Sequence, residues 1–475
     1  MVAAGVGAAQ RAAGGTRRSV VKGATMALGA AGAVATLAAC GQGGGAPAAG
    51  TSGAPASLSG SLTWFMRAAA AELPWEQAAV TAFKEQAPGV TVNLETVSVA
   101  RDFDPKLTAL VAGGTPPDVW THWGESGFGD YQAKGLLADL TPMAARDRVD
   151  GSTFLPNTYE AWKVGGKLYG LSFNQRFGTF VYYNKQLFDA AGVPLPATDW
   201  EDRTWTWDRM TEAARRVTGS GAAGQTFGFG AGAQPGLWGL AYQFGGDFFT
   251  KEHYANGLAR TSNIGSPEVL AAMTARADLM NKTRVWPTQA DFAAVGINGL
   301  TPLFIAGRLG MLMDTGSEWP RIDKESRFEW GVAAVPRQKD NKMVNFINPL
   351  MLSKDSKNKE AAWAFMKWNV GEPGQRLLVQ NSFQPVHKAL VDEWLKGGSF
   401  KQTAAEVKKV VEGAAPHSQI SPNQLFVEFG LVRTAVDEAM AATWSGERSA
   451  ADGLRDAKTK VDSILAETYA RYGGK

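Results

Sequence analysis

The stretch SLTWFMRAAAAELPWEQAAVTAFKEQAPGVTVNLETV, residues 61–97, predicts how the chain begins to fold. Residues 61–66 are apolar enough for a buried strand. Residues 72–86 follow as a helix, which tolerates Pro74 because this residue lies in the first turn. Apolar and polar side chains then alternate in residues 90–97, and this period of two is typical of a strand. The stretch therefore predicts a strand, a helix and a second strand.

The same order continues beyond this stretch. We expect a helix over residues 106–111 and a third strand that begins at residue 116 and contains Trp120. Strands that alternate with helices favour a parallel sheet with right-handed crossovers. In open sheets of this kind, ligands bind beyond the carboxyl ends of the strands. Trp64 and Trp120 come near the ends of the first and third strands, so we expect large aromatic side chains at one edge of the sheet.

The remainder of the chain mixes strand-like and helix-like patterns, and no internal repeat is present. A cap at Ser356 is expected to begin one of the helices, and the chain after residue 400 is expected to be mostly helical. The other predicted elements are strands at 166–171 and 181–185 joined by a connection over 172–178, helices at 207–217 and 359–370, and a helix end, glycine turn and strand over 304–313.

The composition excludes several classes of protein. The chain has 475 residues with 48 aromatic side chains, which is too many for intrinsic disorder over most of its length. A single cysteine excludes a disulfide scaffold and zinc sites built from several cysteines. A net charge of +3 gives no reason to expect a nucleic-acid partner. The four histidines are scattered, so we expect neither a metal nor another cofactor.

Residues 1–39 are typical of an export signal. They contain four basic residues and no acidic one, and the pair Arg17 and Arg18 precedes a weakly apolar run. This run is less apolar than a membrane-spanning helix of ~20 residues requires. Small residues stand directly before Cys40, as in a bacterial lipoprotein signal, in which the cysteine is lipid-modified and becomes the first residue of the mature chain. The pattern predicts a twin-arginine-type lipoprotein signal peptide.

Residues 40–57 are expected to form a flexible tether, because they are uncharged and rich in glycine, alanine, proline and serine. Without the four basic residues of the signal, the 48 basic residues of the chain fall to 44, against 45 acidic ones. We therefore expect an exported, nearly neutral body that is held on the outer face of the cell membrane by its lipid alone.

Six short motifs occur in a fixed order along the chain. They are Pro117-Asp118-Val119, Gly166-Lys167-Leu168-Tyr169-Gly170, Tyr183-Asn184-Lys185-x-x-Phe188, Gly192-Val193-Pro194, Phe304-x-x-Gly307-Arg308-x-Gly310-Met311 and Ser356-Lys357-Asn358-Lys359-Glu360-Ala361-Ala362. Together they resemble the family 1 extracellular solute-binding proteins, which are sugar-binding lipoproteins of ABC importers of the maltose-binding-protein type. The resemblance covers about two-thirds of the chain.

This resemblance implies a two-lobed periplasmic-binding-protein-like α/β fold. Each lobe would be a mainly parallel sheet flanked by helices, and the ligand cleft would lie between the lobes. The N-lobe would comprise residues 58–173 plus 343–388, and the C-lobe residues 174–342 plus 389–475. The implied function is a monomeric receptor that closes on a carbohydrate, expected to be an oligosaccharide, and delivers it unchanged to the permease subunits of an ABC importer.

A sugar has apolar C–H faces and a rim of hydroxyl groups. Indole rings cover the faces, whereas amide, carboxylate and guanidinium groups bind the hydroxyls. We expect the Trp319→Ala substitution to weaken binding without unfolding the protein. Core packing is the alternative for any of these tryptophans. The expected ligand contacts are Trp64, Arg67, Trp120, Trp123, Asn174, Arg176, Trp238, Asp314, Trp319 and Asn348. The tryptophans expected in the core instead are Trp205, Trp207, Trp363 and Trp368.

Two other functions stay open. The same fold could bind a non-sugar solute, such as a polyamine, a phosphodiester or a peptide. An exported carbohydrate hydrolase would need two carboxylates, and no paired-carboxylate motif is present. The string Asp314-Thr315-Gly316-Ser317 matches that of aspartic proteases, but the second copy that would supply the other carboxylate is absent. We therefore expect a binding protein and not an enzyme.

Overall fold

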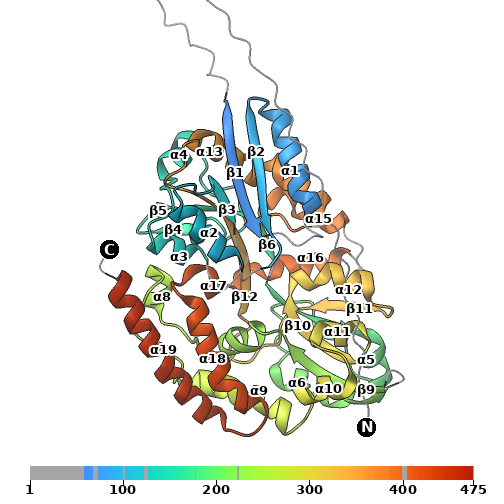
Figure 1. Cartoon of the computed structure of the whole chain (residues 1–475). Helices are drawn as coiled ribbons and strands as arrows, with labels where there is room; N and C mark the ends of the chain where they lie inside the picture. Colours follow the sequence, from blue (N-terminus) through green and yellow to red (C-terminus); the bar gives the residue numbers. More distant parts are fainter. Residues whose placement is uncertain are drawn as a thin grey trace, which may run out of the picture. The chain divides into compact units, whose positions relative to one another are not determined.

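The computed structural model describes residues 58–67, 73–99, 102–121, 127–176, 178–221, 224–381, 383–397 and 404–473 (Figure 1). The chain divides into a unit that ends at Ala56 and a unit from Ser57 to Lys475. The expected signal peptide, the tether and Cys40 lie outside the described residues and stay predictions. Among the described residues, no helix combines the length and the apolarity needed to cross a membrane.

The N-terminal pattern builds a six-stranded sheet. Its strands follow the order β13-β12-β3-β1-β2, and β6 also pairs with β12. β1 is parallel to both β2 and β3, with α1 (Leu73–Gln86) and α2 (Phe103–Ala112) as connections, so the predicted parallel unit is confirmed. Figure 1 shows β1 and β2 side by side, with their carboxyl ends toward β6. The strands are β1 (Gly60–Arg67), β2 (Val90–Val97), β3 (Val119–Thr121), β6 (Gly170–Arg176), β12 (Met343–Leu352) and β13 (Ser418–Ile420).

A second sheet has five strands in the order β11-β7-β10-β9-β8. Only β9 and β10 are parallel, so the expectation of a mainly parallel sheet is wrong for this part of the chain. The reason is the direction of β7, which follows β6 directly and runs away from Gly178. β10 runs toward Gly178 and ends beside it, where Thr315 pairs with Thr179, so the two strands are antiparallel. The strands are β7 (Thr179–Asn184), β8 (Gly219–Gly221), β9 (Gly224–Ala231), β10 (Leu309–Thr315) and β11 (Trp330–Ala333); β4 (Lys163–Val164) and β5 (Lys167–Leu168) form a separate pair.

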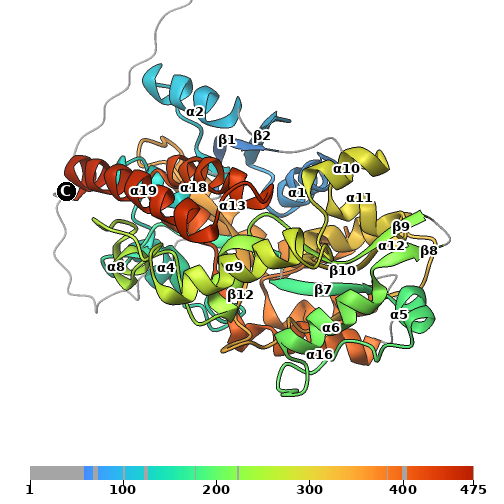
Figure 2. The same ribbon diagram turned by 90° about the horizontal axis from the view of Figure 1, so that it is seen from below.

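Helices flank both sheets, and two of them have the predicted bounds, α6 (Trp207–Val217) and α13 (Lys359–Val370). α18 and α19 lie side by side in both views (Figure 2). The other α-helices are α3 (Phe128–Ala133), α4 (Thr141–Asp147), α5 (Lys185–Ala191), α7 (Leu240–Gln243), α8 (Lys251–Asn256), α9 (Pro267–Asn281), α10 (Gln289–Val295), α11 (Leu300–Ile305), α12 (Trp319–Glu325), α14 (Glu372–Gln380), α15 (Val391–Gly397), α16 (Ala404–Gly413), α17 (Pro422–Leu425), α18 (Phe429–Trp444) and α19 (Ala450–Tyr472). Shorter turns are η2 (Glu160–Trp162), the π-helix η3 (Pro235–Gly239), η4 (Gly316–Glu318), η5 (Lys388–Leu390) and η6 (Ala415–His417).

Buried apolar side chains form two core clusters. The first draws on residues 62–173 and 347–386, and the second on residues 180–344 and 391–465. The four tryptophans expected in the core are all buried in one or the other. Each cluster therefore combines segments that are far apart in the sequence, and the chain passes between the clusters along β6–β7, along β12 and again between residues 386 and 391.

The predicted connection over residues 172–178 is wrong, because β6 extends to Arg176. Its polar residues pair with buried partners that the local pattern does not reveal. Ser172 donates its hydroxyl to the Thr158 carbonyl at 2.5 Å, and the Asn348 amide donates to Asn174 Oδ1 at 2.7 Å. Strand pairing with β12 therefore decides the conformation of this segment.

Ser356 also differs from its expected role. The N-cap of α13 is Asn358, and Ser356 instead donates its hydroxyl to Asp118 Oδ1 at 2.5 Å. The other carboxylate oxygen of Asp118 accepts the backbone N–H of Thr63 at 2.8 Å. Asp118 thus ties the start of β3 to β1 and to the segment before α13.

Gly228 in β9 permits a close contact between the second sheet and α6. A Cβ at this position would lie 1.9 Å from the Ala214 carbonyl oxygen. Because backbone atoms form this contact, we expect Gly228→Ala to destabilise the protein by about 3 kcal/mol. Gly219 in the neighbouring strand β8 has no atom within 4 Å of such a Cβ, so Gly219→Ala should change the stability by less than about 0.5 kcal/mol. Urea unfolding of both variants checks this, and equal midpoints would contradict it.

Candidate functional site

Polar side chains gather where the chain crosses between the two core clusters. Asn174 near the end of β6 and Asn348 in β12 are both buried and joined through their side-chain amides. On the second-cluster side of the crossing, the Thr179 hydroxyl donates to the Val344 carbonyl at 3.3 Å. The backbone N–H of Gly316 donates to the Gly178 carbonyl, also at 3.3 Å. These bonds bring the ends of β6, β10 and the first half of β12 to one place.

Asp314 is the ionisable group at the end of β10. The Thr315 N–H donates to its Oδ1 at 2.7 Å, and the side chain is partly exposed. Burial raises the pKa of this carboxyl to about 7; the Thr315 N–H lowers the pKa in part, and the charge of Glu318 raises it. Among the side chains that the structure describes, which do not include that of Arg176, no cation lies within ion-pair distance of it. Such a carboxylate is poised to accept hydrogen bonds from a bound molecule.

The loop after β9 lies against this carboxylate. A Cβ at Gly232 would be 2.5 Å from both carboxylate oxygens of Asp314, so a larger residue here would have to displace this carboxylate. Two residues later, Gln234 Oε1 accepts the Ser421 hydroxyl at 2.8 Å. The Thr315 and Ser317 hydroxyls lie 2.5 Å apart on the neighbouring turn. We call Gly232–Gln234, Asp314–Ser317 and Ser421 the hinge-side polar cluster; it can bind hydroxyl groups through an amide, hydroxyls and a carboxylate.

Trp64 and Trp120 do not form the expected aromatic edge. Phe65 pairs with Trp120 across β1 and β3, so alternation places Trp64 on the opposite face of the sheet. Neither indole is exposed to solvent. The Trp64 ring packs 5.1 Å from Phe365, and the Trp120 ring packs 5.8 Å from Tyr131. Both therefore lie in the first core cluster.

Trp238 and Trp319 are also buried. The ring of Trp238 in η3 lies 4.6 Å from that of Phe248, and the ring of Trp319 at the start of α12 lies 5.7 Å from that of Trp330. Their exposed fractions are 1% and 4%. Both side chains belong to the second core cluster.

The remaining expected contacts are placed only in part. Arg67 is the last residue of β1, and its Nε is buried with no hydrogen-bond partner among the described residues. For Arg176 the structure describes the backbone, which pairs with Phe346, and Trp123 lies outside the described residues. The structure thus brings Asn174, Asn348 and Asp314 to the crossing, and it places four of the five tryptophans in the cores.

Gln234 and Ser421 are polar residues at the crossing that the sequence alone did not indicate. Gln234 follows a glycine-rich string that is easily read as an ordinary loop, and Ser421 follows β13, a strand of three residues. The parallel pairing of β13 with β12 brings Ser421 to the crossing. That pairing joins segments about 75 residues apart, so no local signal could have indicated it.

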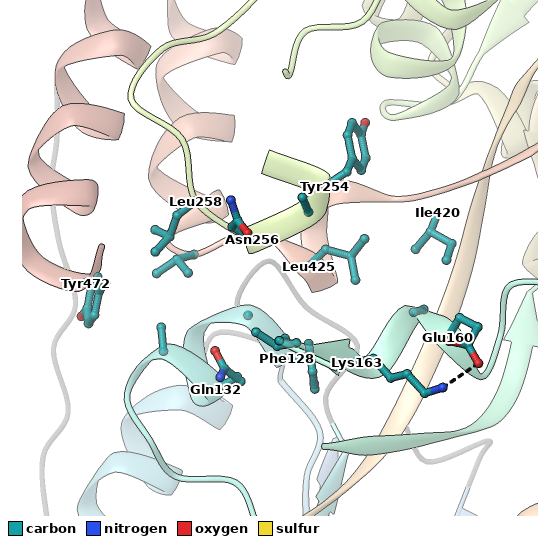
Figure 3. Close-up of a pocket in the computed structure, with 18 of the residues that line it drawn as sticks. Phe128, Gln132, Glu160, Lys163, Tyr254, Asn256, Leu258, Ile420, Leu425 and Tyr472 are labelled. Atoms are coloured by element: carbon teal, nitrogen blue, oxygen red, sulfur yellow. Dashed lines mark hydrogen bonds and ion pairs between the residues drawn. The ribbon is translucent and has the colours of Figure 1, made fainter. Parts of the chain in front are cut away.

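A groove of about 870 Å³ also separates side chains of the two clusters. Its lining includes Phe128 of the first cluster and Tyr254, which packs against the second. None of the expected ligand contacts lines it. The Lys163 ammonium is paired with Glu160 at 2.8 Å. In Figure 3, Phe128, Gln132 and Lys163 lie across the groove from Tyr254, Asn256 and Leu258.

Beside this groove the two clusters touch. A Cβ at Gly129 in α3 would lie 2.3 Å from the Leu425 carbonyl oxygen. The backbone N–H of Glu428 donates to Asp130 Oδ1 at 3.0 Å, and the Glu428 carboxylate accepts the Thr468 hydroxyl of α19 at 2.7 Å. Among the described residues, no group of three or more His, Cys, Asp or Glu side chains is placed to hold a metal ion.

Comparison with known proteins agrees with this architecture. The model of the family "Bacterial extracellular solute-binding protein" matches residues 69–376. A protein of Brucella abortus (strain 2308) that is named a binding protein is 24% identical over 406 residues, which are 82% of this chain and 90% of the relative.

Two solved structures have the same fold. One is an ABC substrate-binding protein from Listeria monocytogenes in complex with cycloalternan; it has a TM-score of 0.70 and 24% identity, and the match covers 85% of this chain and 98% of that one. The other is a cyclic alpha-maltosyl-1,6-maltose binding protein from Arthrobacter globiformis, with a TM-score of 0.68, 20% identity and coverage of 86% and 100%. The expected two-lobed periplasmic-binding-protein-like fold is confirmed.

Proposed function

The chain belongs to the bacterial extracellular solute-binding protein family, and we propose that it is a carbohydrate receptor that serves an ABC importer. In this proposal the two core clusters are the two lobes, with the boundaries expected from the sequence, and the solute binds between them at the crossing. The chain acts as a monomer and releases its solute unchanged to the permease subunits.

The observation that carries this proposal is the hinge-side polar cluster, together with the Asn174–Asn348 pair. Neutral amides, hydroxyls and one carboxylate that has no cationic partner among the described side chains match the hydroxyl rim of a sugar. The two solved relatives described above were crystallised with, or named for, cyclic oligosaccharides, and this supports an oligosaccharide in preference to a charged solute.

We propose Arg67, Asn174, Arg176, Asp314 and Asn348 as ligand contacts, together with Gln234 and Trp123. The four tryptophans that were expected as ligand contacts but are buried would instead form part of the lobe cores behind this site; they are Trp64, Trp120, Trp238 and Trp319. A ligand that touches both lobes stabilises the closed form by its difference in affinity for the two forms. Closure also removes water from the hydrogen bonds and so strengthens them.

The experiment that tests the function is a thermal-shift titration of residues 57–475. The panel contains cycloalternan, maltotriose, mannotriose, a monosaccharide and a polyamine. A binding sugar at 100 times its Kd should stabilise the folded protein by about 2.7 kcal/mol, and the shift should follow its concentration. A response to the polyamine alone would identify a non-sugar receptor, and release of shorter sugars would identify a hydrolase.

The lipid anchor is a separate part of the proposal and rests on the sequence around Cys40. Without the thiol, no acyl chain can be attached, and the tether alone has no apolar surface that would hold a membrane. In the Cys40→Ser variant, we therefore expect the protein to leave the membrane fraction of the cells. If the variant stayed as firmly bound to membranes as the natural chain, the anchor would lie elsewhere.

A further inference from the structure

Arg276 in α9 carries a positive charge that has no acidic partner in contact among the described residues. Among the described residues, no carboxylate lies within ion-pair distance of it, and Asp437 acts on it only through its more distant charge. Its Nε is buried and has no hydrogen-bond partner among those residues. Burial lowers the pKa of this guanidinium to about 10. A partly buried cation in such surroundings is costly unless other contacts offset the cost.

Two indole rings supply those contacts. The guanidinium carbon lies 3.9 Å from the centre of the Trp444 ring at the end of α18, and 5.0 Å from that of Trp286. α9 and α18 lie against each other in the fold (Figure 2). The negative faces of aromatic rings attract a cation, most strongly where water is excluded. Arg276 is thus held by rings on two different segments.

Arg276 also donates a hydrogen bond to the backbone of the loop that follows β9. Arg276 Nη1 donates to the Gly236 carbonyl at 3.0 Å. Gly236 is also close to Trp286, because a Cβ at this glycine would lie 3.1 Å from the tip of that ring. Pro235 and Gly236 are the first two residues of the π-helix η3. Such helices are rare in proteins, and those that occur often lie at functional sites.

Backbone hydrogen bonds connect Gly236 to the hinge-side polar cluster. The Gly236 N–H donates to the Gly232 carbonyl at 2.7 Å, and the Gly232 N–H donates to the Met313 carbonyl at 2.9 Å. Gly232 lies against Asp314, and Gln234 stands between the two glycines. A shift of Gly236 would therefore move both Gln234 and the wall beside the Asp314 carboxylate.

We propose that Arg276 is a positioning residue for solute binding: its guanidinium, held between Trp286 and Trp444, fixes the 232–236 loop against Asp314. This inference rests on the proposed function, because it assigns the loop to the solute site. Arg276 itself does not touch the solute. A lysine cannot replace it. The planar guanidinium can face both indole rings and still donate a hydrogen bond to the Gly236 carbonyl, whereas an ammonium group is not planar.

The test compares the full-length chain with its Arg276→Ala and Arg276→Lys variants by calorimetric titration of the sugar that responds in the panel. Loss of a hydrogen bond from a charged group should weaken binding about tenfold or more in both variants. Methylguanidinium should restore the affinity of Arg276→Ala, whereas tetramethylammonium at the same concentration should not. The matched control is Arg260→Ala, because Arg260 is exposed and lies 4.0 Å above the Tyr469 ring instead.

A second measurement needs no sugar. Hydrogen exchange at the amides of Gly236, Leu237 and Gly239 should be faster in Arg276→Ala than in the natural chain or Arg260→Ala. If no sugar bound the natural chain, the proposed function would fail, and exchange would still decide whether Arg276 holds the loop. If a sugar bound the natural chain and Arg276→Ala equally well, or if exchange stayed unchanged, the positioning role would be overturned while the receptor function stood.

Discussion

The Trp319→Ala variant is expected to lose about 3–5 kcal/mol of stability. The indole of Trp319 is 4% exposed and packs edge-on against Trp330, Phe180 and Tyr182, with ring centres 5.7, 6.2 and 6.2 Å away. Its removal opens a cavity in the second core cluster that rigid neighbours cannot fill. This expectation replaces the one from the sequence, which placed the loss in binding alone.

Equilibrium unfolding in urea measures the effect, and a solute titration of the same variant separates stability from affinity. Leu431→Ala is the control, because Leu431 is 54% exposed and should change the stability by less than about 0.5 kcal/mol. A Trp319→Ala variant that kept nearly full stability but bound no sugar would show that the indole faces the solute after all.

If the chain binds the proposed sugar, the Asp314→Asn variant is expected to bind it about 30- to 100-fold more weakly than the natural chain. The substitution keeps the size of the side chain but removes the charge that strengthens hydrogen bonds from hydroxyl groups. Isothermal titration at pH 8 measures the loss. Asp456→Asn is a matched control, since Asp456 lies in α19 and pairs with Arg448. Equal affinities of Asp314→Asn and the control would remove Asp314 from the site.

The same carboxylate should make stability and binding depend on pH in opposite directions. Burial raises the pKa of Asp314 in the folded protein from 3.8 to about 7, so the folded state holds this proton more tightly than the unfolded state. Its contribution therefore favours folding below about pH 4 and is lost as the pH rises toward 7. In the proposed site, sugar hydroxyls would donate to the ionised form, so affinity should rise over the same range. Both pH trends should disappear in Asp314→Asn. If they persist in this variant, another group causes them.

Much of the fold could be predicted because its signals are local. The alternation in β2, the bounds of α6 and α13 and the glycine turn before β10 all follow from side chains within one element. The polar end of β6 and the three residues of β13 could not be predicted, since each becomes a strand only by pairing with β12. Distant pairing, not local propensity, decides such segments.

The candidate site was predicted less well for a related reason. Composition and strand order indicated aromatic and polar ligand contacts, but they did not indicate which way each side chain points. A one-residue difference along a strand reverses the face, and this puts Trp64 and Trp120 on opposite sides of their sheet. Arg276 carried no sequence signal, because its partners Trp286, Trp444 and Gly236 come from three separate segments.

The position of β12 has a consequence for synthesis on the ribosome. This strand lies between β3 and β13 and also pairs with β6, yet it is translated after the whole second sheet. Until it emerges, the nascent chain must carry β3 and β6 with open edges, which are prone to pair with other chains. Completion of the first sheet is therefore delayed until most of the polypeptide has been made.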